Sequence, residues 1–155
     1  MPYDARAIAN FFIDLGLASG QAIDPMKLQK LVYYAVGWYA GYTGQPLIDE
    51  QIEAWPYGPV VPSIYHSFKG YGSSPIQRRL ESVPPILEAD ICGFLNNVWQ
   101  SYRDYSPLQL SSFSHEPGGP WDLARKQNPG MRSVGIDFSL IQDRFRAAVE
   151  RMQNK

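Results

Sequence analysis

Apolar side chains repeat at helical spacing along most of the chain. In the first twenty residues they recur every three or four positions, which predicts a helix that ends by Ser19 and Gly20. The apolar positions of this helix are Ile8, Phe11, Phe12 and Leu15.

A second helix is expected to begin at Asp24 and Pro25, because an aspartate side chain accepts hydrogen bonds from free backbone amides and proline fits the first helical turn. Apolar and aromatic residues occupy every side of this helix as far as Tyr42, as is typical of a buried helix. We therefore predict that it is the central element. Its first turns hold Lys27, Gln29 and Lys30, the only members expected to reach water or a partner.

A short strand is predicted over residues 51–57, where polar and apolar residues alternate and β-formers are frequent. Pro56 confines this strand to an edge or a bulge. Gly58 and Pro59 predict a turn, and residues 76–83 are the expected partner strand of a hairpin.

Further helices are predicted by the same periodicity over residues 60–68, 87–102 and 141–152, the last capped by Ser139 with Gln142. Ser106 and Gln109 form a capping-box pattern that opens a short helix, and a turn or two of helix follows at 121–126. The predicted fold is mainly α (α+β): a compact bundle around a buried central helix with a small β-hairpin, forming one domain over residues 1–155.

Composition narrows the class of protein. Fourteen basic against fifteen acidic residues give a net charge of −1, and aromatic residues make up 14% of the chain. No signal peptide, membrane span, phosphate-binding glycine loop or metal-ligand motif is apparent, so no cofactor, metal or membrane partner is expected. A single cysteine, Cys92, cannot form an intrachain disulfide and favours a cytoplasmic protein.

Candidate catalytic groups are few. His66 and His115 are the only histidines, and the run Ser114, His115, Glu116 contains triad residue types whose adjacent side chains point in different directions. Cys92 is interpreted as a small hydrophobic residue of the helix over 87–102. An enzyme is therefore not expected, and a small hydrolase using His115 or His66 as general base stays as an alternative.

Nucleic-acid binding is not expected, because the basic residues near the C-terminus alternate with acidic ones and the chain has no net positive charge. A DNA-binding regulator stays as a second alternative. The remaining signal is a group of tryptophans and tyrosines near predicted turns, residue types that are enriched at protein interfaces but are also common in cores. The sequence leaves both roles open for Trp55, Gly58 and Trp121.

The segment from Leu28 to Gly72 resembles the Panacea domain of SocA-like antitoxins, which is also found in phage-associated GepA-type proteins. The matching features are Lys30, the aromatic residues that follow it, and the run from Ala54 to Val60. Downstream, the family's Leu-Ser-x-Leu-Thr-His followed by tryptophan is similar to residues 110–115 and Trp121. Phe113 and Ser114 depart from the more common leucine and threonine.

This resemblance implies an antitoxin that binds and suppresses a cognate toxin protein encoded beside it. One mechanism known in the family delivers the toxin to the ClpXP protease as a proteolytic adaptor, and direct masking is the other. The identity of the toxin does not follow, and the chain as a homo-oligomer stays an open alternative. We predict a partner-binding surface formed by Lys27, Lys30, Trp55, Tyr57, Gly58, Tyr65, His66, His115 and Trp121.

Overall fold

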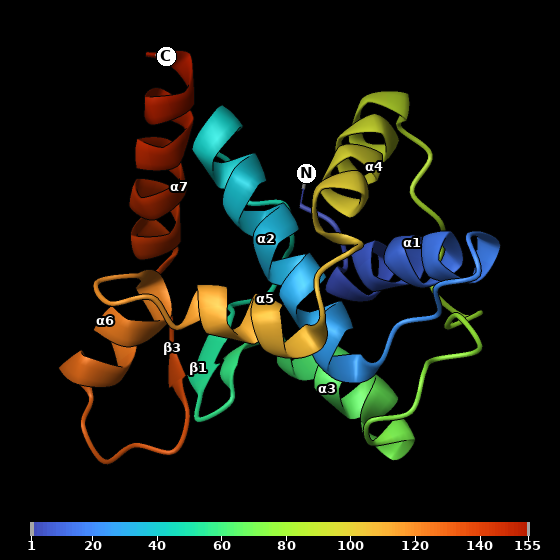
Figure 1. The fold of residues 1–155 in the computed structure, drawn as a ribbon, viewed down its shortest axis with the longest axis horizontal. Coiled ribbons are helices and arrows are strands. Elements are labelled where there is room, and N and C mark those ends of the chain that lie inside the picture. The colour runs from blue at the N-terminus through green and yellow to red at the C-terminus, as the bar shows by residue number, and fades with distance from the viewer. Residues whose placement is uncertain (1, 155) are drawn as a thin grey trace.

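A computed structural model describes residues 2–154, and over that range it is built from seven α-helices and three short strands (Figure 1). This confirms the mainly α (α+β) class. The helices are α1 Ala5–Ala18, α2 Pro25–Thr43, α3 Pro62–Phe68, α4 Ala89–Tyr102, α5 Pro107–Ser114, α6 Pro120–Gln127 and α7 Phe138–Gln153, with a single 3-10 turn, Lys69–Tyr71, after α3.

Helix α2 is the central element, as predicted. It contacts α1, α3, α4, α5, α7 and the strand β2 (Gly58–Val60), and Figure 1 shows it between α7 on one side and α1 and α4 on the other. Asp24 caps it by accepting a hydrogen bond from the amide of Lys27 at 2.7 Å, and Gly44 ends it in the left-handed conformation. No helix within residues 2–154 is long and apolar enough to cross a membrane.

The first turns of α2 correct one expectation. Gln29 and Lys30 do not reach water, because they are only 6% and 1% exposed. The Gln29 side-chain amide instead donates to the carbonyl of Val61 at 3.2 Å and accepts from its amide at 2.8 Å. Both residues therefore face the strand β2 and its extension rather than solvent.

Two glycines on one face of α2 allow α7 to pack closely against it. A side chain at Gly37 would collide with the ring of Phe145, and one at Gly41 would lie 2.8 Å from the Phe145 carbonyl. The apolar stripe predicted for this last helix is confirmed at Ile141, Phe145 and Ala148, which are buried, but its fourth member, Met152, is exposed. Its predicted cap is wrong: Asp137 occupies the N-cap position, and Ser139 lies inside the helix.

The sheet differs from the predicted hairpin. Strand β1 (Glu53–Trp55) lies in the middle, between β2 (Gly58–Val60) and β3 (Val134–Gly135), and pairs antiparallel with both. Gly58 and Pro59 thus belong to the second strand, and the turn is formed by Pro56 and Tyr57.

Residues 76–83 are not a strand. The side chain of Asn10 in α1 pairs with the backbone of Leu80, donating to its carbonyl at 2.8 Å and accepting from its amide at 2.7 Å. The amide of Ile76 donates to the carbonyl of Ile23 at 2.7 Å. These bonds fix the segment against α1 and the start of α2 without a strand partner.

The remaining helical predictions are confirmed with shifts at their ends. Helix α4 begins at Ala89, so Leu87 lies outside it and is 81% exposed. The capping box of α5 is present, because Ser106 and Gln109 exchange side-chain to backbone bonds in both directions.

A candidate partner-binding surface

The backbone of Gly58, directly after the β1–β2 turn, lies very close to the side chains of Lys30 and His115. Gly58 is buried with a φ of 122°, a conformation that L side chains rarely adopt. A Cβ atom at this position would lie 3.0 Å from Nζ of Lys30 and 3.2 Å from Cε1 of His115. The predicted residues Lys30, Gly58 and His115, far apart in sequence, therefore meet at one point.

Lys30 ends in a buried ammonium group. Its Nζ donates a hydrogen bond to the carbonyl of Pro59 at 3.3 Å. Burial lowers the pKa of this amine to about 8, because the charged form loses its hydration. No carboxylate among residues 2–154 forms an ion pair with Lys30.

Trp121 and His115 hold the other side of the hairpin. The indole of Trp121 donates to the carbonyl of Trp55 at 2.6 Å, and the rings of Trp121 and His115 lie 4.0 Å apart. Nδ1 of His115 lies 2.5 Å from the Ser111 carbonyl, at the end of α5. Trp55, Trp121 and Gly58 thus all take part in contacts that hold the hairpin against α5 and α6.

The run Ser114, His115, Glu116 does not form a triad. The Ser114 hydroxyl donates to the carbonyl of Ser111 at 2.7 Å, and Glu116 forms an ion pair with Arg144 of α7. His66, the other histidine, is exposed on α3 beside Tyr65, with ring centroids 5.4 Å apart. Within the described residues, no group of three or more His, Cys, Asp or Glu side chains could hold a metal ion.

Four of the predicted residues line one pocket of about 260 Å³ between α2, α3 and the hairpin. They are Lys30, Trp55, Tyr57 and Tyr65. Tyr57 is 69% exposed at its rim. We call this cavity the Lys30 pocket.

Lys27 does not belong to this cluster. Its Nζ donates to the carbonyl of Arg103 at 2.5 Å, and it lines a different cavity together with Gln21 and Asp104. Lys27 and Lys30 are three residues apart on α2, yet the first faces the end of α4 and the second faces the hairpin. The structure therefore separates two residues that the sequence grouped.

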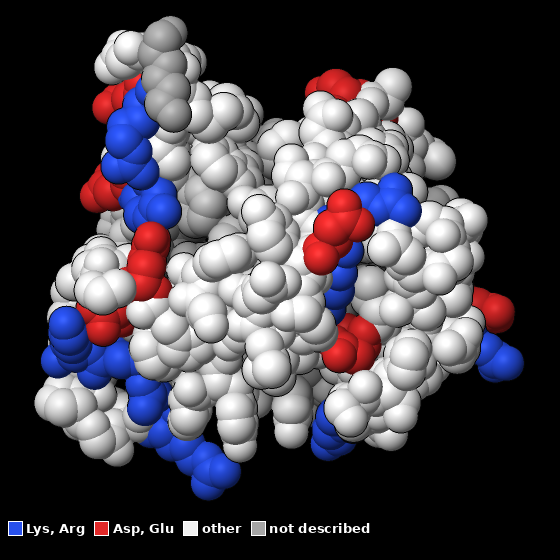
Figure 2. Space-filling model, in the orientation of Figure 1, with Lys and Arg blue, Asp and Glu red and all other residues white. Residues whose placement is uncertain are grey.

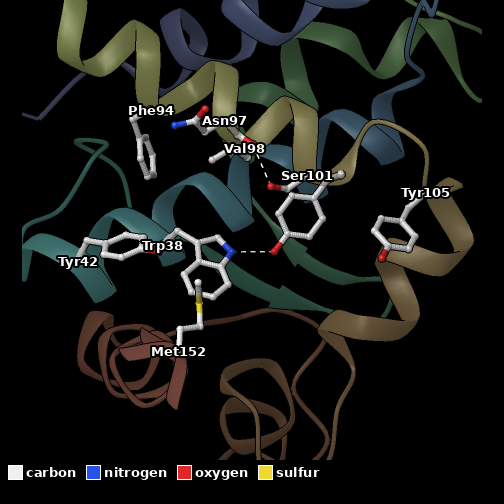
Figure 3. A pocket seen from close by; sticks show the side chains of 9 residues that line it. Trp38, Tyr42, Phe94, Asn97, Val98, Ser101, Tyr105 and Met152 are labelled. Carbon is white, nitrogen blue, oxygen red and sulfur yellow. Dashed lines mark hydrogen bonds between the residues drawn. The ribbon is translucent and has the colours of Figure 1, made fainter. Parts of the chain in front are cut away.

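A second apolar surface was missed by sequence reasoning. Two adjoining cavities, of about 480 and 550 Å³, lie among α2, α4, α5 and α7 and share Trp38, Tyr102 and Tyr105. We call them together the aromatic groove. The indole of Trp38 donates a hydrogen bond to the Tyr102 hydroxyl at 2.7 Å. Figure 3 shows this bond as a dashed line from Trp38 and places Met152 of α7 next to the indole.

The groove has few charged groups. No charged residue lines the first cavity. The charged residues that line the second are Arg144 and Glu116, which pair with each other. Helical periodicity predicts that the aromatic residues of α2 and α4 lie on apolar helix faces. It does not predict that α4 and α7 leave these residues partly uncovered.

Comparison with known proteins assigns the family. A model of the family described as Antitoxin SocA-like, Panacea domain, matches residues 28–122. Antitoxin SocA from Caulobacter vibrioides (strain NA1000 / CB15N) is 35% identical over 156 aligned positions, which cover 92% of this chain and 82% of that protein. No solved structure matches. The region matched by the family model contains most of the central helix, the hairpin and His115 to Trp121, so the chain belongs to the SocA-like Panacea family of antitoxins.

Proposed function

We propose that this protein is an antitoxin that neutralises a toxin protein encoded beside it by binding that toxin directly in the cytoplasm. Family membership supports the antitoxin role. The observation that supports direct binding is a face of the molecule on which large apolar side chains are exposed and charges are scarce.

This face, which we call the aromatic face, runs from the Lys30 pocket across α5 to the aromatic groove. Helix α5 lies in front of α2 in Figure 1, with the hairpin below it. Ser112 and Phe113 of α5 also line the aromatic groove. The Ser111 hydroxyl of α5 donates to the Tyr57 carbonyl at 3.4 Å, which joins the two parts. The exposed large apolar residues along the face are Tyr42, Tyr57, Tyr65, Tyr105, Leu108, Phe113 and Met152.

Figure 2 shows the same face with a white surface in the middle, charged side chains along α7 and around α6 on one side, and a second group of acidic and basic side chains right of the centre. An apolar centre with a charged margin is the arrangement found in protein–protein interfaces. Exposed apolar patches of this kind on a folded domain mark binding surfaces. A stable interface needs about 800 Å² per partner, and a few tyrosine, tryptophan or arginine side chains supply most of its energy.

The predicted partner-binding residues divide into two roles in this proposal. Tyr57, Tyr65 and His66 are exposed and contact the toxin. Trp55, Gly58, His115 and Trp121 hold the hairpin in place. Lys27 faces away from the hairpin, and we assign it no contact.

Co-expression with the product of the neighbouring gene tests the proposal. We expect the neighbour alone to stop growth, and this protein to restore growth and to co-purify with it. Repeating the experiment in cells without ClpXP separates the two mechanisms: a masking antitoxin still rescues growth, whereas a proteolytic adaptor does not. A neighbour that is not toxic, or rescue in both strains without a complex, would contradict direct binding.

A further inference from the structure

The larger cavity of the aromatic groove, about 550 Å³, is lined by Tyr33 of α2, and we call it the Tyr33 cavity. Two of its lining residues, Phe113 and Tyr105, are 47% and 38% exposed, whereas Tyr33, Tyr34 and Phe145 are buried. The cavity therefore has an open mouth and a buried aromatic floor. Its volume lies in the range of ligand pockets, about 300–1,000 Å³.

The hydroxyl group of Tyr33 has no hydrogen-bond partner among residues 2–154, and the side chain is only 2% exposed. In that range, Nε of Arg79 is the single fully buried side-chain atom without a partner, so the Tyr33 oxygen is not sealed off from solvent. Burial raises the pKa of Tyr33, and the charges of Glu116 and Arg144, which line the same cavity, act on it in opposite directions. The free hydroxyl therefore opens into the Tyr33 cavity.

A second hydroxyl in this cavity is only half used. The oxygen of Tyr102 accepts a hydrogen bond from the indole of Trp38, but its own hydrogen has no acceptor within residues 2–154. Arg144 and Glu116 already neutralise each other, with Nη2 of Arg144 donating to Glu116 at 3.1 Å. The polar group that suits the cavity is therefore a neutral one that accepts a hydrogen bond and can return one to Tyr33.

The walls of the cavity suit an aromatic ring. The rings of Tyr34 and Tyr102 are stacked with their centroids 4.5 Å apart. Those of Tyr105 and Phe113 meet edge to face at 5.2 Å. Rings packed in this way present both faces and edges to a further ring, which gains from either contact. Because the walls pack against one another before a ligand arrives, the ordering cost of binding is small.

From this geometry we propose that the Tyr33 cavity binds a tyrosine side chain of the partner protein, with its ring among the aromatic walls and its hydroxyl bonded to that of Tyr33. A phenol hydroxyl both accepts and donates, whereas the indole of tryptophan only donates and phenylalanine does neither. This rests on the proposed function in one respect, that the tyrosine belongs to the toxin. The preference of the cavity for a phenol can be tested without the toxin.

The first test uses N-acetyl-tyrosinamide as the probe and N-acetyl-phenylalaninamide, which lacks only the hydroxyl, as its control. Amide chemical shifts of the full chain report binding. We expect saturable shifts at Ser112 and Ala148, which line the cavity, and an affinity at least about threefold higher for the tyrosine probe.

Two matched variants locate the preference. Tyr33→Phe removes only the hydroxyl and should make the two probes bind equally, with no loss of stability in urea, because that hydroxyl has no bond within the fold to lose. Tyr39→Phe makes the same change on the same helix outside the cavity and should leave the preference intact.

Four results would overturn the proposal. They are the absence of saturable shifts with either probe, equal binding of both probes to the wild-type chain, an unchanged preference in Tyr33→Phe, and shifts confined to the Lys30 pocket. A clear loss of stability in Tyr33→Phe would also contradict it, because the hydroxyl would then be bonded within the fold.

The second test measures the affinity of the toxin for the same variants. We expect Tyr33→Phe to weaken it at least about threefold, with Tyr39→Phe unchanged. If the wild-type chain prefers the tyrosine probe through Tyr33 but binds no neighbouring gene product, the proposed function fails and the cavity assignment stands. If the wild-type chain binds the toxin and Tyr33→Phe binds it equally well, the cavity assignment fails and the proposed function stands.

Discussion

The ammonium group of Lys30 lies against the backbone of Gly58, so that a methyl group on Gly58 would come within 3.0 Å of Nζ. The same methyl group would lie 3.2 Å from Cε1 of His115. This contact brings together the central helix, the hairpin and the end of α5. It also explains why two strands of only three residues hold a fixed position, since a short isolated hairpin is at best marginally stable.

Gly58→Ala should destabilise the protein by about 2–4 kcal/mol, because the φ of 122° is strained for alanine and the added methyl group meets Lys30 and His115. Gly118→Ala is the matched control: its φ of 77° is also positive, but nothing lies within 4 Å of the added atom. Urea denaturation of both variants measures the difference. If both variants lost the same free energy of unfolding, the contacts of the added methyl group with Lys30 and His115 would have no effect on stability.

Lys30→Met should stabilise the protein at neutral pH. Burial lowers the pKa of Lys30 from 10.5 to about 8, so between these values the unfolded chain binds more protons than the folded one and stability rises with pH. The loss of stability caused by burying the charged ammonium group is full below about pH 8 and disappears above pH 10.5. We expect Lys30→Met to raise the free energy of unfolding by about 1–3 kcal/mol at pH 7 and by less at pH 10, as measured by denaturation at both pH values.

A loss of stability in Lys30→Met that is the same at pH 7 and pH 10 would contradict this account. It would mean that the methylene chain and the bond to Pro59 matter more than the buried charge. A variant that is more stable yet binds the toxin less well would be the signature of a residue kept for binding.

Gly41→Ala should destabilise the protein by about 2–4 kcal/mol, because the methyl group would lie 2.8 Å from the Phe145 carbonyl and neither backbone can move without separating α2 from α7. At Gly93 in α4, no atom lies within 4 Å of an added methyl group, so Gly93→Ala should stabilise the protein by up to about 1 kcal/mol through helix propensity. Thermal unfolding compares the two. A mild effect at Gly41 would mean that α7 is held mainly by other contacts.

The sequence predicts the helical part of this fold well, because helical signals are local. Asp24 with Pro25 and the capping box of Ser106 with Gln109 mark helix starts that the structure contains. The apolar surroundings of α2 correctly predict its central place. These signals need only residues within a few positions of one another.

The errors concern contacts between distant residues. The strand that pairs with β1 on its second side is Val134–Gly135, about eighty residues away, and residues 76–83 are bound by Asn10 of α1 instead. A short strand has no local pattern that identifies its partner. Lys30 was expected at the surface because charged residues are almost never buried, and only the structure shows the hairpin that covers it.

The candidate site could be predicted in part. Trp55, Tyr57 and Tyr65 were identified because aromatic residues lie near glycine and proline, and the structure brings them to one pocket. The aromatic groove was not predicted, since Trp38 and Tyr102 lie on apolar helix faces that read as core. Whether such a face is covered depends on the directions of α4 and α7, which are properties of the whole fold.

The most direct test of the central claim is the dissociation constant between the purified protein and its neighbouring gene product, measured by titration calorimetry. Tyr57→Ala and Tyr105→Ala remove exposed side chains from the two halves of the aromatic face, and Leu87→Ala removes a leucine that is 81% exposed and lines neither cavity of the groove nor the Lys30 pocket. We predict that each tyrosine variant weakens binding at least tenfold, about 1.4 kcal/mol, with unchanged folding, while Leu87→Ala binds as the wild type does. Equal affinity of all four proteins would show that the toxin binds elsewhere and would contradict the account.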